Sequence, residues 1–356
     1  MIKKVDYIIV GFGLAGACLA VQLMRRGKQI AVFDTPDQNR ASAVAAGIFN
    51  PITGKRIVKT WKADEMFRYL HSFYKSVEDE IGEKFYYPRE LYTPFRSIDE
   101  QNEWMGKSAD PYFSNYVLSV TTRSTYGDQV TDPLGGILLA NCGYINTNVF
   151  VYSIRKMVKA SHYYAEEELD ENNLKIESGK ISYQLLSAQK IIFCTGIHQL
   201  KSRLFKGLPL KPLKGEVITI KTSAPLNRIY NRGVYVIESG DMEYKVGATY
   251  NLVSPEDGVT DDGRAELMQK VSDFLNVDFK VTHQDWGIRP STIDRRPLLG
   301  NHPQYESVVI FNGLGTKGVS LAPYFSDQLT KWLIDGANLD REVNISRVKA
   351  LYSNSD

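Results

Sequence analysis

The sequence predicts an α/β protein, and two observations at the ends of the chain support this. Residues 5–10 form an apolar strand, the glycine-rich turn GFGLAG follows, and residues 17–26 show helical periodicity before a second strand over 29–33. Near the other end, an apolar strand over 308–311 precedes a helix over 318–334 with one apolar face. Together they predict a Rossmann-like nucleotide-binding domain.

A third observation indicates a second domain. With 356 residues the chain exceeds one average domain, and its middle contains short strand patterns typical of an antiparallel sheet. We predict a nucleotide-binding domain over 1–84, 142–210 and 287–356. A discontinuous α+β substrate domain, built on a mainly antiparallel sheet, then takes 85–141 and 211–286.

The remaining elements are predicted from periodicity and capping residues. Thr147 is predicted to cap a helix that runs to about Lys159. Residues 35–59 are expected to be irregular, and a long loop of this kind is usually functional. The other helices are expected over 63–81 and 262–275, and the other strands over 85–95, 116–122, 136–139, 190–194, 213–221, 234–238, 244–249 and 279–286.

Composition excludes several classes of function. There are 43 basic and 41 acidic residues, a net charge of +2, so no strong overall field attracts nucleic acid or an anionic membrane. No membrane-spanning run is expected. The cysteines Cys18, Cys142 and Cys194 are widely spaced, which favours a reducing, cytoplasmic setting. Neither a metal-ligand cluster nor a Ser-His-Asp order is visible.

The glycine turn has the spacing of a dinucleotide site. Gly11, Gly13 and Gly16 follow a strand and open a helix, and Asp34 stands eighteen residues beyond Gly16. The glycines allow a tight turn, close approach to a pyrophosphate and close helix packing, while Asp34 would accept hydrogen bonds from a ribose. This pattern does not distinguish NAD from FAD. A glycine turn of another α/β protein is the alternative.

The order of several motifs along the chain carries a resemblance to a known family. These motifs are GFGLAGA, then Asp34, then the small residues before Ile48, then IIFCTG, GIRPSTIDRRPLLG and NGLGTKGVSLAP. Their order resembles the FAD-dependent amine oxidase family that contains D-amino-acid oxidase, glycine oxidase and sarcosine oxidase. The resemblance is strongest over the first fifty and last seventy residues.

The resemblance implies a Rossmann-like FAD-binding domain and noncovalent FAD, because residues 286–299 contain no cysteine to tether it. Reduced flavin is anionic, so the cation Lys317 beside a helix N-terminus would favour reduction; a solvated lysine is the alternative. Besides the turn and Asp34, the implied cofactor residues are Ser42, Ala46, Gly47, Thr195, Gly196, Gly313, Gly315, Thr316, Lys317 and Gly318.

The resemblance also assigns substrate-binding residues. Arg289 would clamp a substrate carboxylate at the end of a strand, with an ion pair to Asp294 as its structural alternative. Tyr235 would donate a second hydrogen bond and Tyr230 would shield the pocket, with ordinary packing as the alternative for Tyr235. Glu238 stands where the related segment has proline.

The implied activity is oxidation of a small carboxylate-bearing amine, namely a D-amino acid, glycine or N-substituted glycine, by hydride transfer to FAD. Dioxygen or another acceptor would take the electrons. The alternatives are a flavin enzyme similar to the one that modifies the tRNA wobble uridine, and a non-catalytic FAD-binding protein. The basic loop around Lys55 and Arg56 either neutralises a second anionic group or is simply solvated.

Overall fold

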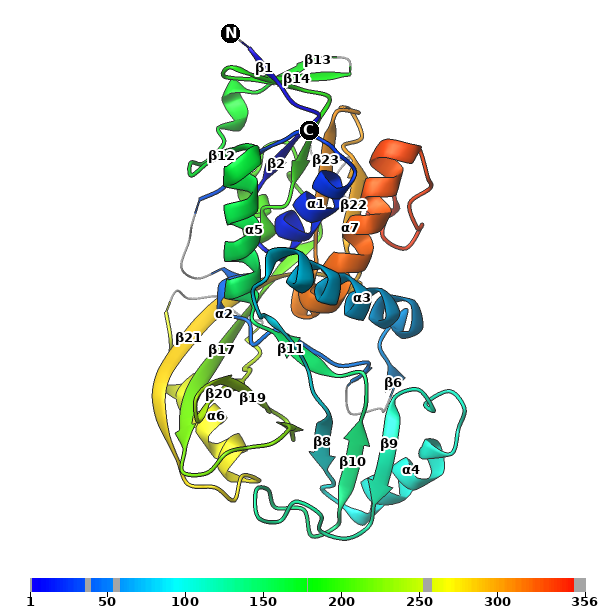
Figure 1. The fold of residues 1–356 in the computed structure, drawn as a ribbon, viewed down its shortest axis with the longest axis vertical. Helices are drawn as coiled ribbons and strands as arrows, with labels where there is room; N and C mark the ends of the chain where they lie inside the picture. Colours follow the sequence, from blue (N-terminus) through cyan, green and yellow to red (C-terminus); the bar gives the residue numbers. More distant parts are fainter. Residues whose placement is uncertain (1, 36–39, 54–57, 178, 252–257, 349–356) are drawn as a thin grey trace.

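Two sheets of different type divide the molecule into an upper and a lower part (Figure 1). The computed structural model describes residues 2–35, 40–53, 58–177, 179–251 and 258–348. The predicted mixed α/β class is confirmed by this arrangement. The proposed residue boundaries of the two domains stay a prediction.

The upper sheet has six strands in the order β12-β3-β2-β16-β23-β22. All neighbours pair in parallel except β22 and β23. Its central strands are buried on both faces, which explains their continuous apolar sequences. The strands are β12 (Tyr163–Ala165), β3 (Ile30–Phe33), β2 (Tyr7–Val10), β16 (Lys190–Phe193), β23 (Val308–Asn312) and β22 (Leu298–Asn301).

Helices cover this sheet because each has an apolar stripe to bury. The core cluster that contains Ile9 and Val32 joins the sheet to α1, α5 and α7 (Figure 1). A further helix, α3, packs against α7. The helices are α1 (Leu14–Arg25), α3 (Ala63–Ile81), α5 (Thr147–Ser161) and α7 (Gly318–Asp335).

The lower sheet has eight strands in the order β21-β17-β20-β19-β18-β8-β10-β9. Its neighbours pair antiparallel except β18 with β8. Helix α6 (Asp261–Ser272) buries Leu267 and Val271 against one face. The strands are β21 (Phe279–Thr292), β17 (Leu210–Thr222), β20 (Glu243–Gly247), β19 (Tyr235–Gly240), β18 (Ile229–Asn231), β8 (Leu91–Pro94), β10 (Gly136–Leu139) and β9 (Val117–Thr121).

Short elements connect and flank the two sheets. In Figure 1 the short helix α2 (Ala41–Val44) and the strand β11 (Gly143–Ile145) lie between them. Strand β11 pairs with β4 (Ile48–Phe49) and β7 (Tyr86–Pro88). Smaller pairings join β5 (Ile52–Thr53) to β6 (Val58–Lys59), and β1 (Lys3–Lys4), β15 (Leu186–Ala188), β14 (Lys180–Tyr183) and β13 (Lys175–Glu177) to one another.

Several sequence predictions differ from the structure in detail. Helix α4 (Ile98–Ser108) was not predicted, although Ser97 accepts a hydrogen bond from the Glu100 amide, the N-terminal signal of a capping box. Thr147 is the first residue of α5, and its cap is the Asn146 side chain, which accepts from the Val149 amide. Strands β17 and β21 are longer than predicted, and residues 35–59 contain α2 and short strands.

Among the residues that the structure describes, no helix combines the length and apolarity that a membrane crossing requires.

Candidate functional site

Four parallel strands deliver the predicted cofactor residues to one edge of the upper sheet. Gly11 follows β2, Asp34 follows β3, Thr195 comes shortly after β16, and Gly313 follows β23. Because carboxyl ends of parallel strands share an edge, these segments meet there, which is where open α/β sheets bind ligands. A Cβ atom on Gly11 would lie 2.7 Å from the Cys194 carbonyl oxygen.

The glycine turn fits a pyrophosphate. Gly13 precedes α1 and no side chain caps this helix. Within the described residues, the amides of Leu14, Ala15 and Gly16 have no protein acceptor, so they are free to bind phosphate oxygens. A Cβ atom on Gly16 would lie 2.1 Å from the Gly11 carbonyl oxygen, so only glycine fits this position.

Asp34 is already engaged by the protein. Its carboxylate accepts hydrogen bonds from the Phe12 amide (2.8 Å) and the Tyr164 hydroxyl (3.0 Å). It also pairs with Arg40 (2.9 Å) and Arg155 (3.5 Å). A carboxylate offers about four acceptor sites, and these four partners occupy them, so Asp34 holds the glycine turn in place. Its contact with a ribose stays a prediction. That contact would require one of the four partners to release the carboxylate.

The small-residue segment lies beside the glycine turn. A Cβ atom on Gly13 would lie 3.1 Å from the Ser42 hydroxyl oxygen, so α2 faces this turn. Ala46 packs against the core cluster beneath α1. Gly47 has φ +75°, and a Cβ atom there would lie 1.9 Å from the Ile145 carbonyl oxygen. The close approach that requires this glycine is therefore with β11.

The second glycine loop precedes α7. Gly313 (φ +75°) and Gly315 (φ +53°) have left-handed backbones, and Gly315 lies against Ser291 of β21. Gly318 lies near Leu14, so the N-termini of α7 and α1 are neighbours. No side chain caps α7, whose flanking residues Thr316 and Lys317 complete the loop. The glycine turn before α1 and the glycine loop before α7 therefore lie close to each other, at one site.

Lys317 is largely buried rather than solvated. Its Nζ donates a hydrogen bond to the Thr60 hydroxyl at 2.8 Å. Burial, together with the nearby cations Arg295 and Arg296, lowers the pKa of Lys317 to about 8. An anion beside it would favour its charged form, which suits a site where negative charge develops.

Arg289 lies on the face of the lower sheet opposite to α6. The sequence suggested that Arg289 ends a strand. In the structure, β21 continues through Pro290 to Thr292, so Arg289 lies inside the strand. A Cβ atom on Gly215 would lie 2.2 Å from the Arg289 guanidinium, which therefore extends over this glycine of β17. Sequence reasoning missed Gly215, although an isolated glycine within a strand signals such a close approach.

The alternative role of Arg289, an ion pair with Asp294, disagrees with the structure. Asp294 pairs with Arg347 at 2.9 Å. In the described part of the chain, Arg289 has no carboxylate partner; it approaches the Thr249 carbonyl oxygen (3.5 Å) and lies 5.1 Å from the centre of the Tyr250 ring. A half-buried guanidinium without a counter-ion is available for an anionic ligand.

Tyr235 shares this face with Arg289. It pairs with Gly247 of β20, and a Cβ atom on Gly247 would lie 2.6 Å from its hydroxyl oxygen. The ring packs with Val44 and Val217. Burial raises the pKa of Tyr235, so its hydroxyl stays protonated at neutral pH and can donate a hydrogen bond.

Tyr230 does not join this pair. It lies opposite Val236 in the strand register, next to Tyr235, so its side chain points to the other face of the sheet. There it is fully buried in the core beneath α6, and its hydroxyl donates to Gln129 at 2.7 Å. Its expected role in shielding the pocket is therefore replaced by packing.

The cysteines offer no reactive thiol. Cys18, Cys142 and Cys194 are buried, and burial raises the pKa of each thiol. Protonated thiols are poor nucleophiles, so we expect acid precipitation of the purified protein to release all of its flavin into the supernatant. Flavin that stays with the precipitate would contradict noncovalent binding.

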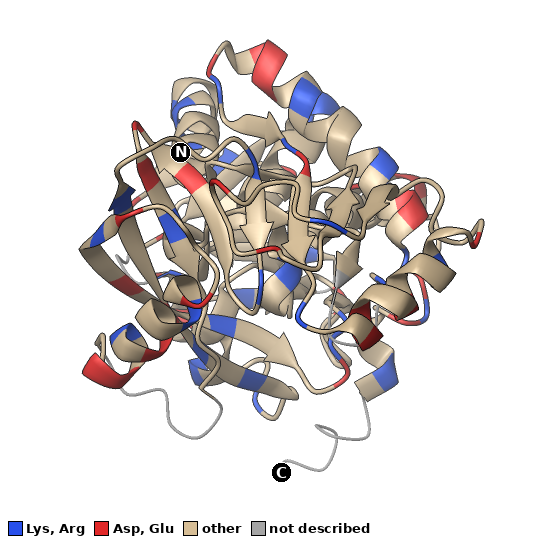
Figure 2. Ribbon diagram, turned by 90° about the horizontal axis from the view of Figure 1, so that it is seen from below, with Lys and Arg blue, Asp and Glu red and all other residues tan. Residues whose placement is uncertain are grey.

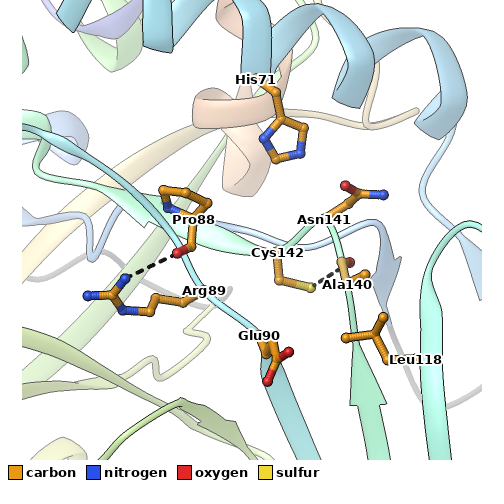
Figure 3. A pocket seen from close by; sticks show the side chains of 8 residues that line it. All are labelled: His71, Pro88, Arg89, Glu90, Leu118, Ala140, Asn141 and Cys142. Carbon is orange, nitrogen blue, oxygen red and sulfur yellow. Dashed lines mark hydrogen bonds between the residues drawn. The ribbon is translucent and has the colours of Figure 1, made fainter.

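A separate cavity of about 380 Å³ lies between α3 and the turns that follow β7 and β10 (Figure 3). Two of its side chains donate hydrogen bonds to nearby carbonyl oxygens: Arg89 to that of Pro88, and the Cys142 thiol to that of Ala140. His71 contacts the Tyr86 hydroxyl. None of the predicted cofactor or substrate residues lines it, so we place the candidate site at the glycine loops and Arg289.

Two predictions concern other parts of the site. Lys55 and Arg56 lie outside the described residues. Among the described residues, no group of three or more His, Cys, Asp or Glu side chains is placed to hold a metal ion.

The fold and the two glycine loops define a dinucleotide-binding protein. The sequence pattern of the family described as FAD dependent oxidoreductase matches residues 6–332, and the chain belongs to this family. The resemblance inferred from the motifs is thereby confirmed, and FAD is the cofactor.

Similar proteins differ in what they do. The chain is 24% identical, over 97% of its length and 59% of the relative, to the tRNA 5-methylaminomethyl-2-thiouridine biosynthesis bifunctional protein MnmC of Idiomarina loihiensis. It is 22% identical to glycine oxidase of Bacillus licheniformis, covering 94% of both chains. Iminodiacetate oxidase from Chelativorans sp. BNC1 has the same fold, with a TM-score of 0.78 and 21% identity over 95% of this chain and 98% of that one.

The chain spans 59% of the MnmC relative and 51% of another relative, the bifunctional protein ThiO/ThiG of Nostoc.

Proposed function

We propose that this oxidoreductase oxidises a small amine that carries a carboxylate. The observation that carries the proposal is the Arg289 guanidinium, which extends over Gly215 beside Tyr235 without a carboxylate partner among the described residues. A planar guanidinium can bind a carboxylate through two parallel hydrogen bonds. Glycine, D-amino acids and N-substituted glycines all present this group next to an amine.

The residues of the chain would bind, orient and shield the substrate. Arg289 and the Tyr235 hydroxyl hold the carboxylate, which fixes the position of the α-carbon. Bound FAD supplies the hydride acceptor. The amine would lose its α-hydrogen with two electrons and a proton from nitrogen, and water would then hydrolyse the imine to a carbonyl compound and ammonia or a primary amine. The N-terminus of α7 and Lys317 would stabilise the negative charge that hydride transfer to the cofactor creates.

The pKa of Lys317 predicts a pH dependence. Its ammonium group is charged below about pH 8 and loses its charge above it. At a fixed amine concentration, we therefore expect anaerobic flavin reduction to become less complete as the pH rises above about 8, beyond the effect of amine protonation. Flavin absorbance measures this. Lys317→Met should remove the additional dependence, and an unchanged profile would contradict this role.

Anaerobic mixing with a panel of amines tests the proposed function directly. Amino acids and N-alkyl glycines should bleach the flavin, and matched amines without a carboxylate should not. No bleaching by any amine would instead favour a non-catalytic FAD-binding protein. Repeating the reaction with and without dioxygen identifies whether oxygen is the electron acceptor.

One observation favours a second candidate, a flavin enzyme that acts on a modified uridine of tRNA. Arg96, Arg232 and Lys270 line a cavity of about 410 Å³ that contains one carboxylate, Asp273. Such a cavity suits a phosphate group. Acidic and basic residues are otherwise interspersed (Figure 2), so a large RNA footprint has less support.

Filter retention of tRNA over a salt series tests this candidate. Retention of tRNA should fall steeply as the salt concentration rises. The double variant Arg96→Ala with Arg232→Ala should weaken retention. The control variant Arg203→Ala should not, because Arg203 does not line this cavity. Absence of retention at low salt would exclude the candidate.

A further inference from the structure

A second cation, Lys245, lies on the same face of the lower sheet as Arg289 and Tyr235. Lys245 is two residues before Gly247 in β20, and Gly247 pairs with Tyr235. Since side chains alternate along a strand, Lys245 projects to the side on which the Tyr235 hydroxyl covers Gly247. This face thus carries two cationic side chains around one phenolic hydroxyl.

The side chain of Lys245 is partly buried. Its Nζ donates to the Val44 carbonyl oxygen of α2 at 3.3 Å, and burial lowers the pKa of Lys245. The carboxylate of Asp285, on the same face of β21, partly offsets this effect. Asp285 in turn interacts with His283 at 3.1 Å. A partly buried ammonium that donates to one carbonyl and has no carboxylate within ion-pair distance among the described residues retains capacity for an anion.

The strand register places the two cationic groups near each other. The Arg289 guanidinium covers Gly215, and Gly215 is two residues from Val217, which pairs with Gly247. Lys245 reaches toward Val44, which packs against Val217 and Tyr235. Rows of one face are about 7 Å apart and neighbouring strands about 5 Å apart. The guanidinium thus lies about one row of side chains from Val217, and the ammonium reaches toward the same valine, so a ligand that spans about one row lies within reach of both.

We propose that Lys245 binds a second anionic group of the substrate and so selects amines with two carboxylates, such as N-carboxymethyl amino acids. This inference rests on the proposed function. Arg289 binds the carboxylate beside the reacting carbon, and Lys245 binds the carboxylate on the other substituent of the nitrogen. An amine with one carboxylate leaves the partly buried ammonium without this partner, which lowers its affinity.

Non-reactive ligands test the proposal on the FAD-loaded protein. Thiodiacetate has two carboxylates and sulfur in place of the amine, and (methylthio)acetate is its counterpart with one carboxylate. Titration calorimetry should give a dissociation constant about tenfold lower for thiodiacetate. Lys245→Met should abolish that difference and leave the affinity for (methylthio)acetate within about twofold, whereas Lys245→Arg should keep most of the difference. Lys221→Met, at an exposed lysine of β17, is the matched control.

Three outcomes would overturn the proposal. Equal affinities for the two ligands in the wild type would show that no second anionic group is bound. If Lys245→Met lowers the affinity for both ligands equally, or causes loss of FAD, Lys245 instead positions α2 through its contact with Val44. If carboxylated amines still bleach the flavin in those cases, the proposed function stands; if none does, that function has failed independently.

Discussion

Replacement of Arg289 by lysine is expected to lower kcat/KM for a carboxylated amine roughly a hundredfold, equivalent to about 2.7 kcal/mol. Lysine keeps the positive charge but lacks the planar pair of donors that the guanidinium extends over Gly215. FAD content and the flavin spectrum should stay normal, because the glycine loops that approach the cofactor are separate from this side chain. Steady-state kinetics and the ratio of flavin to protein absorbance measure both quantities.

Amines without a carboxylate provide the internal control for this variant. They should be poor substrates of the wild type, and their kcat/KM should change little in Arg289→Lys. The control variant Arg228→Lys, at an arginine paired with Glu90, should have little effect on kcat/KM for either class of amine. If both classes of amine lose activity equally, or if FAD is lost, Arg289 has a structural role and the carboxylate assignment fails.

Gly16→Ala is expected to abolish stable FAD binding. A Cβ atom at this position would lie 2.1 Å from the Gly11 carbonyl oxygen, and because this is a backbone atom, no side-chain rotation can relieve the clash. Helix α1 must therefore move away from the turn, which displaces the amides of Leu14 and Ala15 from the pyrophosphate. The purified variant should contain less than about a tenth of the wild-type flavin, measured by absorbance after acid release.

Two further glycine variants make this result interpretable. Gly106→Ala, in helix α4 with no atom near the added Cβ, should leave FAD content unchanged. Gly13→Ala should give an intermediate loss, because the atom it approaches is the movable Ser42 hydroxyl at 3.1 Å. Circular dichroism separates loss of FAD from loss of the fold. A folded Gly16→Ala protein with full flavin content would refute the close-approach argument.

The sequence by itself determined the cofactor end of the protein. Gly11, Gly13, Gly16 and Asp34 are local signals, since a turn, a helix start and a strand end depend on neighbours in the chain. The same locality made helix α3 predictable to the residue from its periodicity. The mixed α/β class followed from these local signals, the use of FAD followed from the resemblance of the ordered motifs to a known family, and both are confirmed.

Only the tertiary structure decided which side chains share the face of the lower sheet that carries Arg289. The sequence assigned both Tyr230 and Tyr235 to the pocket, yet the pairing of β18 with β19 sends them to opposite faces of the sheet. Arg289 owes its position to Gly215, and Lys245 meets Val44 although about two hundred residues separate them. Such contacts arise from strand register and from packing between the two sheets. Both depend on long-range pairing, which a single sequence does not encode as a local pattern.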